Sequence, residues 1–359
     1  MDPEVITSLD QINPTWLTRV LRRNEVLKGG RVAEVSYESD VTSFSIIAHL
    51  KISYTRNSEA PDRLFLKFSK PVHPVSTPEG GWEVIFYKFV APHTPSVLRC
   101  YDAVFSREQR KLHLLLEDVS DTHYSEPPSQ LPPTRRNCEL IVRALADIHA
   151  AWWERPPWDV LGWSLPDQTE VDRRITDVRE RISRFANFLG DRLTENQRSI
   201  YREVLAALPD LYTRLTLPDG YTVVHEDIHI GNVLYPRDPD TGSVRIIDWQ
   251  TWLIDLAPKD LAHMMALFWF PEQRRVLETP LLKQYHDRLC ENGVTGYSWE
   301  QLWYDYRLCV IRKLFHPAWQ WDTGHEPNIW WNHLERVMMA YEDLECRELV
   351  KGGRIREAD

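Results

Sequence analysis

The apolar positions in the first third of the chain change from a helical to an alternating spacing. Between residues 14 and 21 they recur every three or four positions, which predicts a short helix that Asn13 can cap. From Ile46 to Tyr54 apolar and polar residues alternate, as they do in a strand covered on one face. Further elements are expected at 63–68 (strand), 83–89 (helix) and 111–116 (strand). We therefore predict a mostly antiparallel sheet with one helix.

A proline-rich segment at 125–133 separates this part from a region of helical spacing. Apolar residues recur at that spacing from 141 to 152 and again from 330 to 344. The exception is 222–250, where two short β-branched runs enclose a polar cluster. A strand-rich smaller half followed by a helix-rich larger half favours an α+β fold with a cleft between two lobes. The lobes are expected at residues 1–118 and 119–359.

Composition and charge exclude several classes of function. Hydrophobic residues make up 43% of the 359 positions, which is enough for a large core. The chain has 43 Lys and Arg against 53 Asp and Glu, a net charge of −10 without a basic stripe. It contains neither an apolar run of 18 residues nor a leader pattern, and its five cysteines form no CxxC pair. We therefore expect a cytoplasmic protein that binds neither nucleic acid nor a membrane.

The most informative segment runs from His225 to Asn232. Within it, His225, Glu226 and His229 match the HExxH pattern of zinc hydrolases, which requires a helix and a third metal ligand. A β-branched run leads into the segment and a glycine and a proline follow closely, which argues against a helix. The chain also has no Glu between Glu226 and Glu272 to serve as a nearby third ligand. Zinc hydrolysis is therefore the weaker alternative.

Phosphoryl transfer explains more of the same residues. It needs a group that orients the acceptor hydroxyl and accepts its proton, and it needs oxygen ligands for Mg²⁺. Asp227, at the end of a predicted strand, could meet the hydroxyl, while Asn232 and Asp248 could hold the metal. The purely structural alternative is that both aspartates only cap turns.

A resemblance to a known family favours the kinase interpretation. The segment HxDxHxGNxL at 225–234, followed by IDWQ at 247–250, resembles the signature of small-molecule kinases of the aminoglycoside phosphotransferase and choline kinase type. These enzymes share the protein-kinase fold, so the resemblance implies two lobes, the first an antiparallel sheet with one helix and the second larger and helical. It implies that Asp227 is the catalytic base and that Asn232 and Asp248 are metal ligands. It also implies ATP and Mg²⁺ as cofactors.

The resemblance extends into the N-terminal part. Lys67, in the predicted strand, stands where these kinases have the lysine that contacts phosphate, although it could also be an exposed strand lysine. Glu83, at the start of the predicted helix, would be its ion-pair partner, with Glu79 as a rival. The loop over the phosphates would be 40–45, which lacks glycine. Contacts from Ser43 and backbone N–H groups are expected there instead, and the preference between ATP and GTP stays open.

Four further positions receive roles from the same resemblance. The backbone of Glu117 and Val119 would bind the adenine at a hinge between the lobes, and a plain strand end is the alternative. His149 is expected to be structural. Asp260 resembles the aspartate that anchors the catalytic loop, and it could also cap a local helix.

The acceptor is expected to contact the helical lobe. Residues 298–331 are rich in Trp and Tyr, most of which we expect in the core and the rest in a pocket or an interface. The predicted substrate contacts are Gln250, Trp319, Asp322 and Trp331. Residues 271–359 carry 12 Lys and Arg against 15 Asp and Glu, an excess too small for an acceptor with several amines.

We therefore predict phosphorylation of a small-molecule hydroxyl, on a metabolite, an amino alcohol or a natural product such as an antibiotic. A pseudokinase that binds nucleotide without transferring phosphate is the second alternative. The sequence does not predict an oligomeric state.

Overall fold

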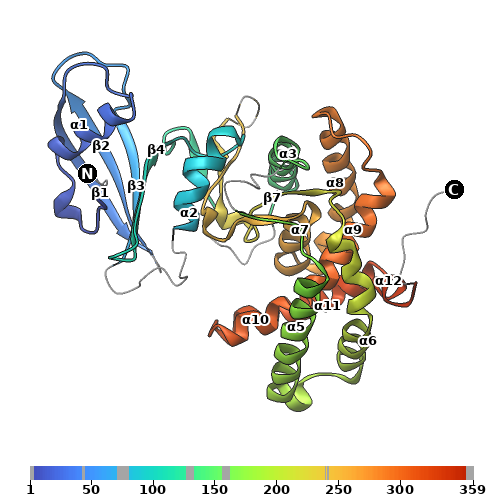
Figure 1. Ribbon diagram of the computed structural model, residues 1–359. Coiled ribbons are helices and arrows are strands. Elements are labelled where there is room, and N and C mark those ends of the chain that lie inside the picture. Colours follow the sequence, from blue (N-terminus) through green and yellow to red (C-terminus); the bar gives the residue numbers. More distant parts are fainter. Residues whose placement is uncertain are drawn as a thin grey trace. The chain divides into compact units, whose positions relative to one another are not determined.

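The computed structural model describes residues 4–42, 45–70, 81–126, 133–155, 162–238, 240 and 242–352. The chain forms two compact units, which we call the strand unit and the helical unit (Figure 1). The strand unit comprises Met1–Ser125 and Leu234–Trp252, and the helical unit comprises Glu126–Val233 and Leu253–Asp359. The chain thus returns to its first unit after leaving it. The boundary after residue 118 stays a prediction.

The strand unit contains a five-stranded antiparallel sheet in the order β1-β2-β3-β5-β4. Its strands are β1 (Val32–Val41), β2 (Ser45–Tyr54), β3 (Arg63–Ser69), β4 (Cys100–Ser106) and β5 (Lys111–Glu117). The strands predicted at positions 46–54, 63–68 and 111–116 are confirmed as β2, β3 and β5. The sequence analysis did not predict β4.

Two helices of the strand unit lie on opposite faces of the sheet; they are α1 (Pro14–Arg23) and α2 (Trp82–Ile85). The cap predicted for α1 is confirmed, because Asn13 accepts a hydrogen bond from the Trp16 N–H. The buried face of α1 shares a core with Leu66 and Phe68 of β3. Successive strand residues point to opposite faces, so Lys67 faces the other side, where it meets α2.

A small second sheet brings residues 234–252 back to the strand unit. Its strands are β6 (His123–Ser125), β8 (Val233–Pro236) and β9 (Arg245–Ile246), in the order β6-β8-β9. Ile246 donates its N–H to the Ser96 carbonyl at 2.8 Å, and His123 Nε2 lies 2.9 Å from the Ser243 carbonyl oxygen. These bonds place Asp248, two residues after β9, in the same unit as Lys67.

The helical unit contains a two-stranded antiparallel sheet of β7 (Tyr221–Val224) and β10 (Leu253–Leu256). Its helices are α3 (Arg135–Ala151), α5 (Gln168–Leu189), α6 (Glu195–Tyr212), α7 (Pro258–Ala262), α8 (Pro271–Glu291), α9 (Trp299–Lys313), α10 (His316–Asp322), α11 (Pro327–Asp343) and α12 (Arg347–Gly352). The helices predicted from apolar spacing at 141–152 and 330–344 are confirmed as α3 and α11. A π-helical turn, His263–Phe268, continues α7.

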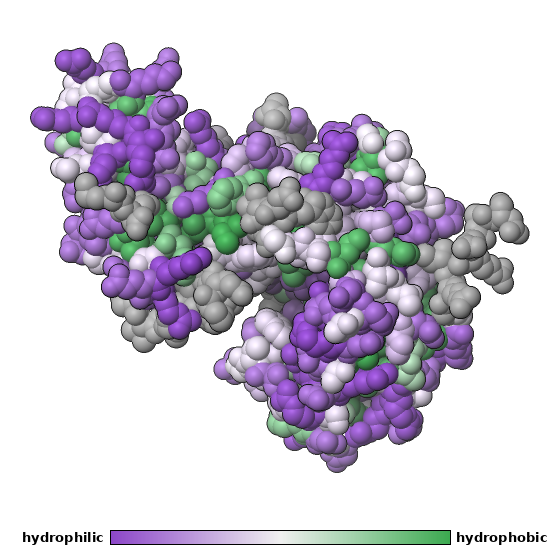
Figure 2. Space-filling view, in the orientation of Figure 1, coloured by the Kyte–Doolittle hydropathy of each residue, from purple (hydrophilic) through white to green (hydrophobic). Residues whose placement is uncertain are grey.

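The surfaces seen in Figure 2 are largely hydrophilic over the outer strands of the strand unit and over α5 and α6. At the edge strand β1, most side chains are exposed, including Glu34, Glu38 and Asp40. Charged residues at an open strand edge oppose pairing with another chain. Among the described residues, no helix combines the length and the apolar character needed to cross a bilayer.

Candidate active site

The polar segment predicted to carry the chemistry is a loop held by one buried carboxylate. β7 ends at Val224, and Asp260 then accepts the backbone N–H groups of His225 and Glu226, both at 2.8 Å. Asp260 Oδ2 also lies 3.2 Å from His149 Nε2, and His149 Nδ1 lies 2.7 Å from the Tyr285 hydroxyl. The anchoring role predicted for Asp260 and the structural role predicted for His149 are thus both confirmed.

The same loop rules out the geometry that the HExxH pattern requires. Residues 225–229 are not helical, so His225 and His229 are not held on one helix face. Within the described ranges, no three His, Cys, Asp or Glu side chains are grouped to hold a metal ion. The zinc alternative therefore has no structural support.

Asp227 and Asn232 lie together on this loop, as the kinase interpretation requires. The Asn232 amide donates to the Asp227 carbonyl at 2.8 Å and lies 3.4 Å from Oδ2 of the Asp227 side chain. Because its nitrogen is used in this way, the amide offers Oδ1 to a cation. The Asp227 side chain is 37% exposed, so one of its faces is open to a substrate.

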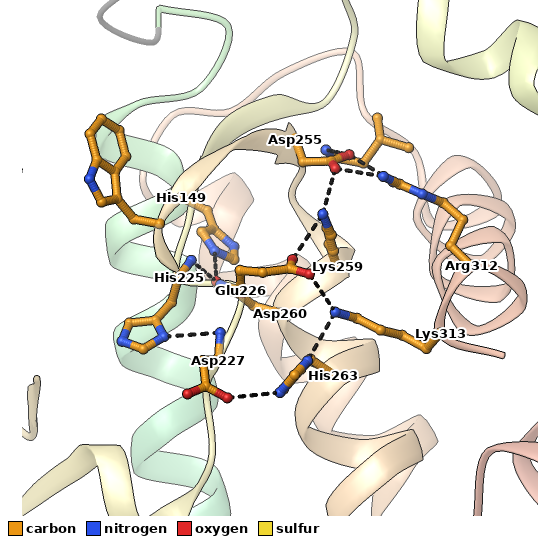
Figure 3. Close-up of polar contacts among 12 residues, drawn as sticks. His149, His225, Glu226, Asp227, Asp255, Lys259, Asp260, His263, Arg312 and Lys313 are labelled. Atoms are coloured by element: carbon orange, nitrogen blue, oxygen red, sulfur yellow. Dashed lines mark hydrogen bonds and ion pairs between the residues drawn. The ribbon is translucent and has the colours of Figure 1, made fainter. Parts of the chain in front are cut away.

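Glu226, between His225 and Asp227, attaches the loop to helices α7 and α9 of the same unit. It has a left-handed backbone (φ +71°), and its carboxylate pairs with Lys259 at 2.9 Å and Lys313 at 3.0 Å (Figure 3). Burial alone would raise the pKa of Glu226, but the two lysines lower it to about 2. Glu226 is therefore a stable anion that fixes the loop.

The ion pairs continue behind Glu226 as an alternating series of charges. Lys259 also pairs with Asp255 at 2.8 Å. Both terminal nitrogens of Arg312 donate hydrogen bonds to the Asp255 carboxylate, at 2.6 and 2.7 Å (Figure 3). Burial would raise the pKa of Asp255, but Arg312 and Lys259 hold it well below its usual value. Sequence reasoning missed Lys259, Lys313 and Arg312. Of these, only Lys259 could have been found from the sequence, because it directly precedes Asp260.

The strand unit holds a second cluster, formed by Lys67, Glu83 and Asp248. Lys67 Nζ donates to Glu83 Oε1 at 2.9 Å and to Asp248 Oδ1 at 2.6 Å. Burial alone would lower the pKa of Lys67, but the two carboxylates raise it above its usual value. The choice of Glu83 as the ion-pair partner is supported by this contact, while its rival Glu79 lies outside the described residues. Lys67, whose side chain is 16% exposed, is therefore a largely buried and fully charged cation.

Aromatic residues fix α2 against the segment that carries Asp248. Trp82 and Trp252 stack with ring centroids 5.2 Å apart. Each indole N–H also donates to the other residue's carbonyl, at 2.6 and 2.9 Å. Phe86 stacks on the fully buried Trp249 at 4.1 Å. We call the Trp82 and Trp252 pair the indole clamp. Sequence reasoning missed it, because neither tryptophan belongs to a motif.

The remaining predicted nucleotide contacts lie in the strand unit. Glu117 ends β5, and its side chain accepts the Arg99 N–H at 3.0 Å. The Val119 carbonyl accepts the N–H groups of Thr122 and His123, at 3.0 and 2.8 Å, which leaves the Val119 N–H as the group for a base to use. Ser43 lies outside the described residues. The hinge role of Glu117 and Val119 stays a prediction.

The four predicted substrate residues have different surroundings. Gln250 lies 3.4 Å from Asp248 Oδ2, and Trp319 is 41% exposed. Asp322 forms ion pairs with Arg184 at 2.6 Å and Arg181 at 3.5 Å, so its charge is already balanced. Trp331 is half-buried beside Trp330, with ring centroids 6.2 Å apart. Their contact with a substrate stays a prediction.

Comparison with solved structures gives relatives of low sequence identity. A candidate aminoglycoside phosphotransferase of Ralstonia eutropha JMP134 is 15% identical, with a TM-score of 0.57 over 96% of this chain and 100% of that one. An ethanolamine kinase of Plasmodium vivax is 12% identical (TM-score 0.54; 89% and 83% covered). A choline/ethanolamine kinase family protein of Mesorhizobium loti is 11% identical (TM-score 0.51; 89% and 92% covered). The predicted protein-kinase-like fold is thereby confirmed.

A search of the curated proteins found no match. At the level of families, residues 52–303 match the phosphotransferase enzyme family. That match covers most of the chain, including β3, α2, the loop after β7 and the position of Asp248. The predicted resemblance is therefore confirmed, and the chain belongs to the phosphotransferase enzyme family.

Proposed function

We propose that this protein transfers the γ-phosphoryl group of ATP to a hydroxyl group of a small molecule. The observation that carries the proposal is the Lys67 ammonium, which is largely buried and paired with carboxylates from α2 and from the segment after β9. A metal-bound polyphosphate carries negative phosphate oxygens and a positive metal ion. A fixed ammonium next to a carboxylate suits such a ligand, because the ammonium can face the phosphate and the carboxylate can face the metal.

The helical unit supplies the groups for the acceptor. Asp227 orients the acceptor hydroxyl and takes its proton while the hydroxyl oxygen bonds to the γ-phosphorus. The bond from that phosphorus to the β–γ bridging oxygen breaks, and ADP leaves with the electron pair. Catalysis then depends mainly on positioning and charge stabilisation, because the transferred group needs no covalent intermediate on the protein.

The side chains suit a magnesium ion by donor type. Asn232 offers an amide oxygen and Asp248 a carboxylate, and Mg²⁺ prefers a few such oxygens together with phosphate oxygens and water. When bound, the ion would neutralise phosphate charge. Lys67 would do the same from the protein side.

For the acceptor, we propose a hydroxyl compound with at most one amine. The balanced charge of residues 271–359 supports this proposal, and so does the pairing of Asp322 with Arg184 and Arg181. The similar structures include proteins described as ethanolamine, choline/ethanolamine and aminoglycoside kinases, so a screen should contain amino alcohols, aminoglycosides and hydroxylated macrocycles.

The test is ADP release in the presence of ATP, Mg²⁺ and each candidate acceptor, with Asp227→Asn as the matched control. We expect at least one acceptor to raise ADP release in the wild type. Asp227→Asn should abolish this increase while keeping the thermal stabilisation by ATP and Mg²⁺. ATP binding without transfer to any acceptor would favour the pseudokinase alternative. Equal turnover in Asp227→Asn would refute the assignment of the base.

A further inference from the structure

His263 is a buried histidine whose two ring nitrogens face different partners. It is the first residue of the π-helical turn after α7, and its side chain is 1% exposed. Nδ1 lies 2.9 Å from Lys313 Nζ, and Nε2 lies 3.4 Å from Oδ1 of Asp227 (Figure 3). Nε2 is fully buried and, within the part of the chain that the structure describes, forms no hydrogen bond, so the Asp227 carboxylate at 3.4 Å is the acceptor group beside it.

The lysine determines which nitrogen carries the proton. An ammonium group has only donors, so Nδ1 must accept from Lys313, and the ring proton then sits on Nε2. Burial, together with the nearby Lys313, holds the pKa of His263 well below its usual value, so the ring is neutral near pH 7. His263 therefore presents a neutral N–H group to the Asp227 carboxylate.

We propose that His263 is a positioning residue for Asp227, holding its carboxylate through the Nε2–H group. This inference rests on the proposed function of Asp227 as the base. Asn232 Nδ2 lies 3.4 Å from Oδ2, so each carboxylate oxygen meets one neutral donor. Two such contacts set the rotation of the carboxylate plane and leave its open lone pairs for the acceptor hydroxyl.

The neutrality of the ring matters for the reaction. A full positive charge at this distance would stabilise the carboxylate and weaken it as a proton acceptor. Lys313 carries the nearest full charge on this side of the ring, and Glu226 pairs with it at 3.0 Å. The histidine thus lies between the Lys313 ammonium and the Asp227 carboxylate. Its contact with Lys313, which is fixed by Glu226, also fixes the position of its ring.

The titratable and charged groups around His263 come from several elements. They are Asp227, Glu226 and His229 on the catalytic loop, Lys313 on α9, His316 on α10 and His333 on α11. Desolvation and neighbouring positive groups hold the pKa values of His316 and His333 below normal, so both are neutral at pH 7. Near pH 7, the ammonium of Lys313 and the carboxylates of Glu226 and Asp227 therefore supply full charges around the ring.

The test compares His263→Gln, whose amide nitrogen can replace Nε2, with His263→Leu, which has no donor. We expect His263→Leu to lower kcat for ADP release by about 10- to 100-fold, up to the loss that a misplacement of about 1 Å can cause, with the ATP dissociation constant unchanged. His263→Gln should recover most of kcat. Equal kcat losses in the Gln and Leu variants, or loss of ATP binding, would overturn the proposal.

A second measurement does not depend on turnover. Nitrogen-15 NMR of the histidine-labelled wild type should show His263 protonated at Nε2 only, with a chemical shift that changes in Asp227→Asn. A ring protonated at Nδ1, or a shift unaffected by Asp227→Asn, would refute the inference. If the tautomer is as expected and no acceptor is phosphorylated, the proposed function fails while the contact between His263 and Asp227 stands.

Discussion

Glu226→Gln tests whether the catalytic loop is held by charge. The substitution keeps the size of the side chain but removes the anion that pairs with Lys259 and Lys313. The pKa of Glu226 falls from 4.5 to about 2 in the folded protein, which corresponds to about 3 kcal/mol of folding stability at neutral pH. A similar cost, roughly 3–5 kcal/mol, is typical when one partner of a buried ion pair is removed.

The direction of the pKa shift determines how the difference in unfolding free energy between the wild type and Glu226→Gln changes with pH. Because folding lowers the pKa of Glu226, its contribution is complete above pH 4.5 and is lost as the pH falls towards 2. Urea unfolding of the wild type and Glu226→Gln, followed at several pH values from 7 to 3, should give a difference of about 3 kcal/mol that shrinks below pH 4.5. Other carboxylates titrate in both proteins, so the difference isolates Glu226.

A surface carboxylate provides the control. Glu291 pairs with Arg288 at 2.9 Å but its side chain is 63% exposed, so Glu291→Gln should cost less than about 0.5 kcal/mol at any of these pH values. A Glu226→Gln difference that stays constant with pH, or is under about 1 kcal/mol at pH 7, would refute the ion-pair account of the loop.

Three further substitutions test the other contacts. Lys67→Met removes the cation between Glu83 and Asp248, and calorimetric titration with ATP and Mg²⁺ should show at least a tenfold weaker affinity, equivalent to about 1.4 kcal/mol. Trp82→Phe removes one N–H hydrogen bond of the indole clamp and should lower the free energy of unfolding in urea by about 1 kcal/mol. It should also weaken ATP binding, and unchanged ATP binding would show that the clamp does not contribute to the nucleotide site. Asp260→Ala leaves two buried N–H groups unpaired and should lower stability by roughly 2–6 kcal/mol, with loss of turnover.

Local patterns were sufficient to predict the residues that sit on short motifs. Asn13 caps α1 because cap and helix are neighbours in the chain, and Asp227 and Asn232 meet because one loop carries both. Lys67 and Glu83 were assigned from the resemblance to small-molecule kinases, and their side chains form the expected ion pair. In the first two cases the partners are close in the chain or belong to one short motif.

The residues that were missed make long-range contacts. Lys313 lies 87 positions after Glu226, and the indole clamp joins Trp82 to a residue 170 positions later. No periodicity or spacing links such partners, because tertiary packing alone brings them together. The sequence analysis missed His263 for the same reason. Its inferred role depends on contacts with both Lys313 and Asp227, which are distant in the chain.

The two central aspartates show how different partners suit the same side chain to different tasks. Asp227 and Asp248 are similarly exposed, at 37% and 32%, so burial does not distinguish them. Asp248, the proposed metal ligand, pairs with the charged Lys67 at 2.6 Å. Asp227, the proposed base, lies 3.4 Å from the neutral donors of Asn232 and His263, which suit the orientation of a carboxylate. The proposed base and the proposed metal ligand therefore differ in the charge of the groups beside them, and not in their exposure.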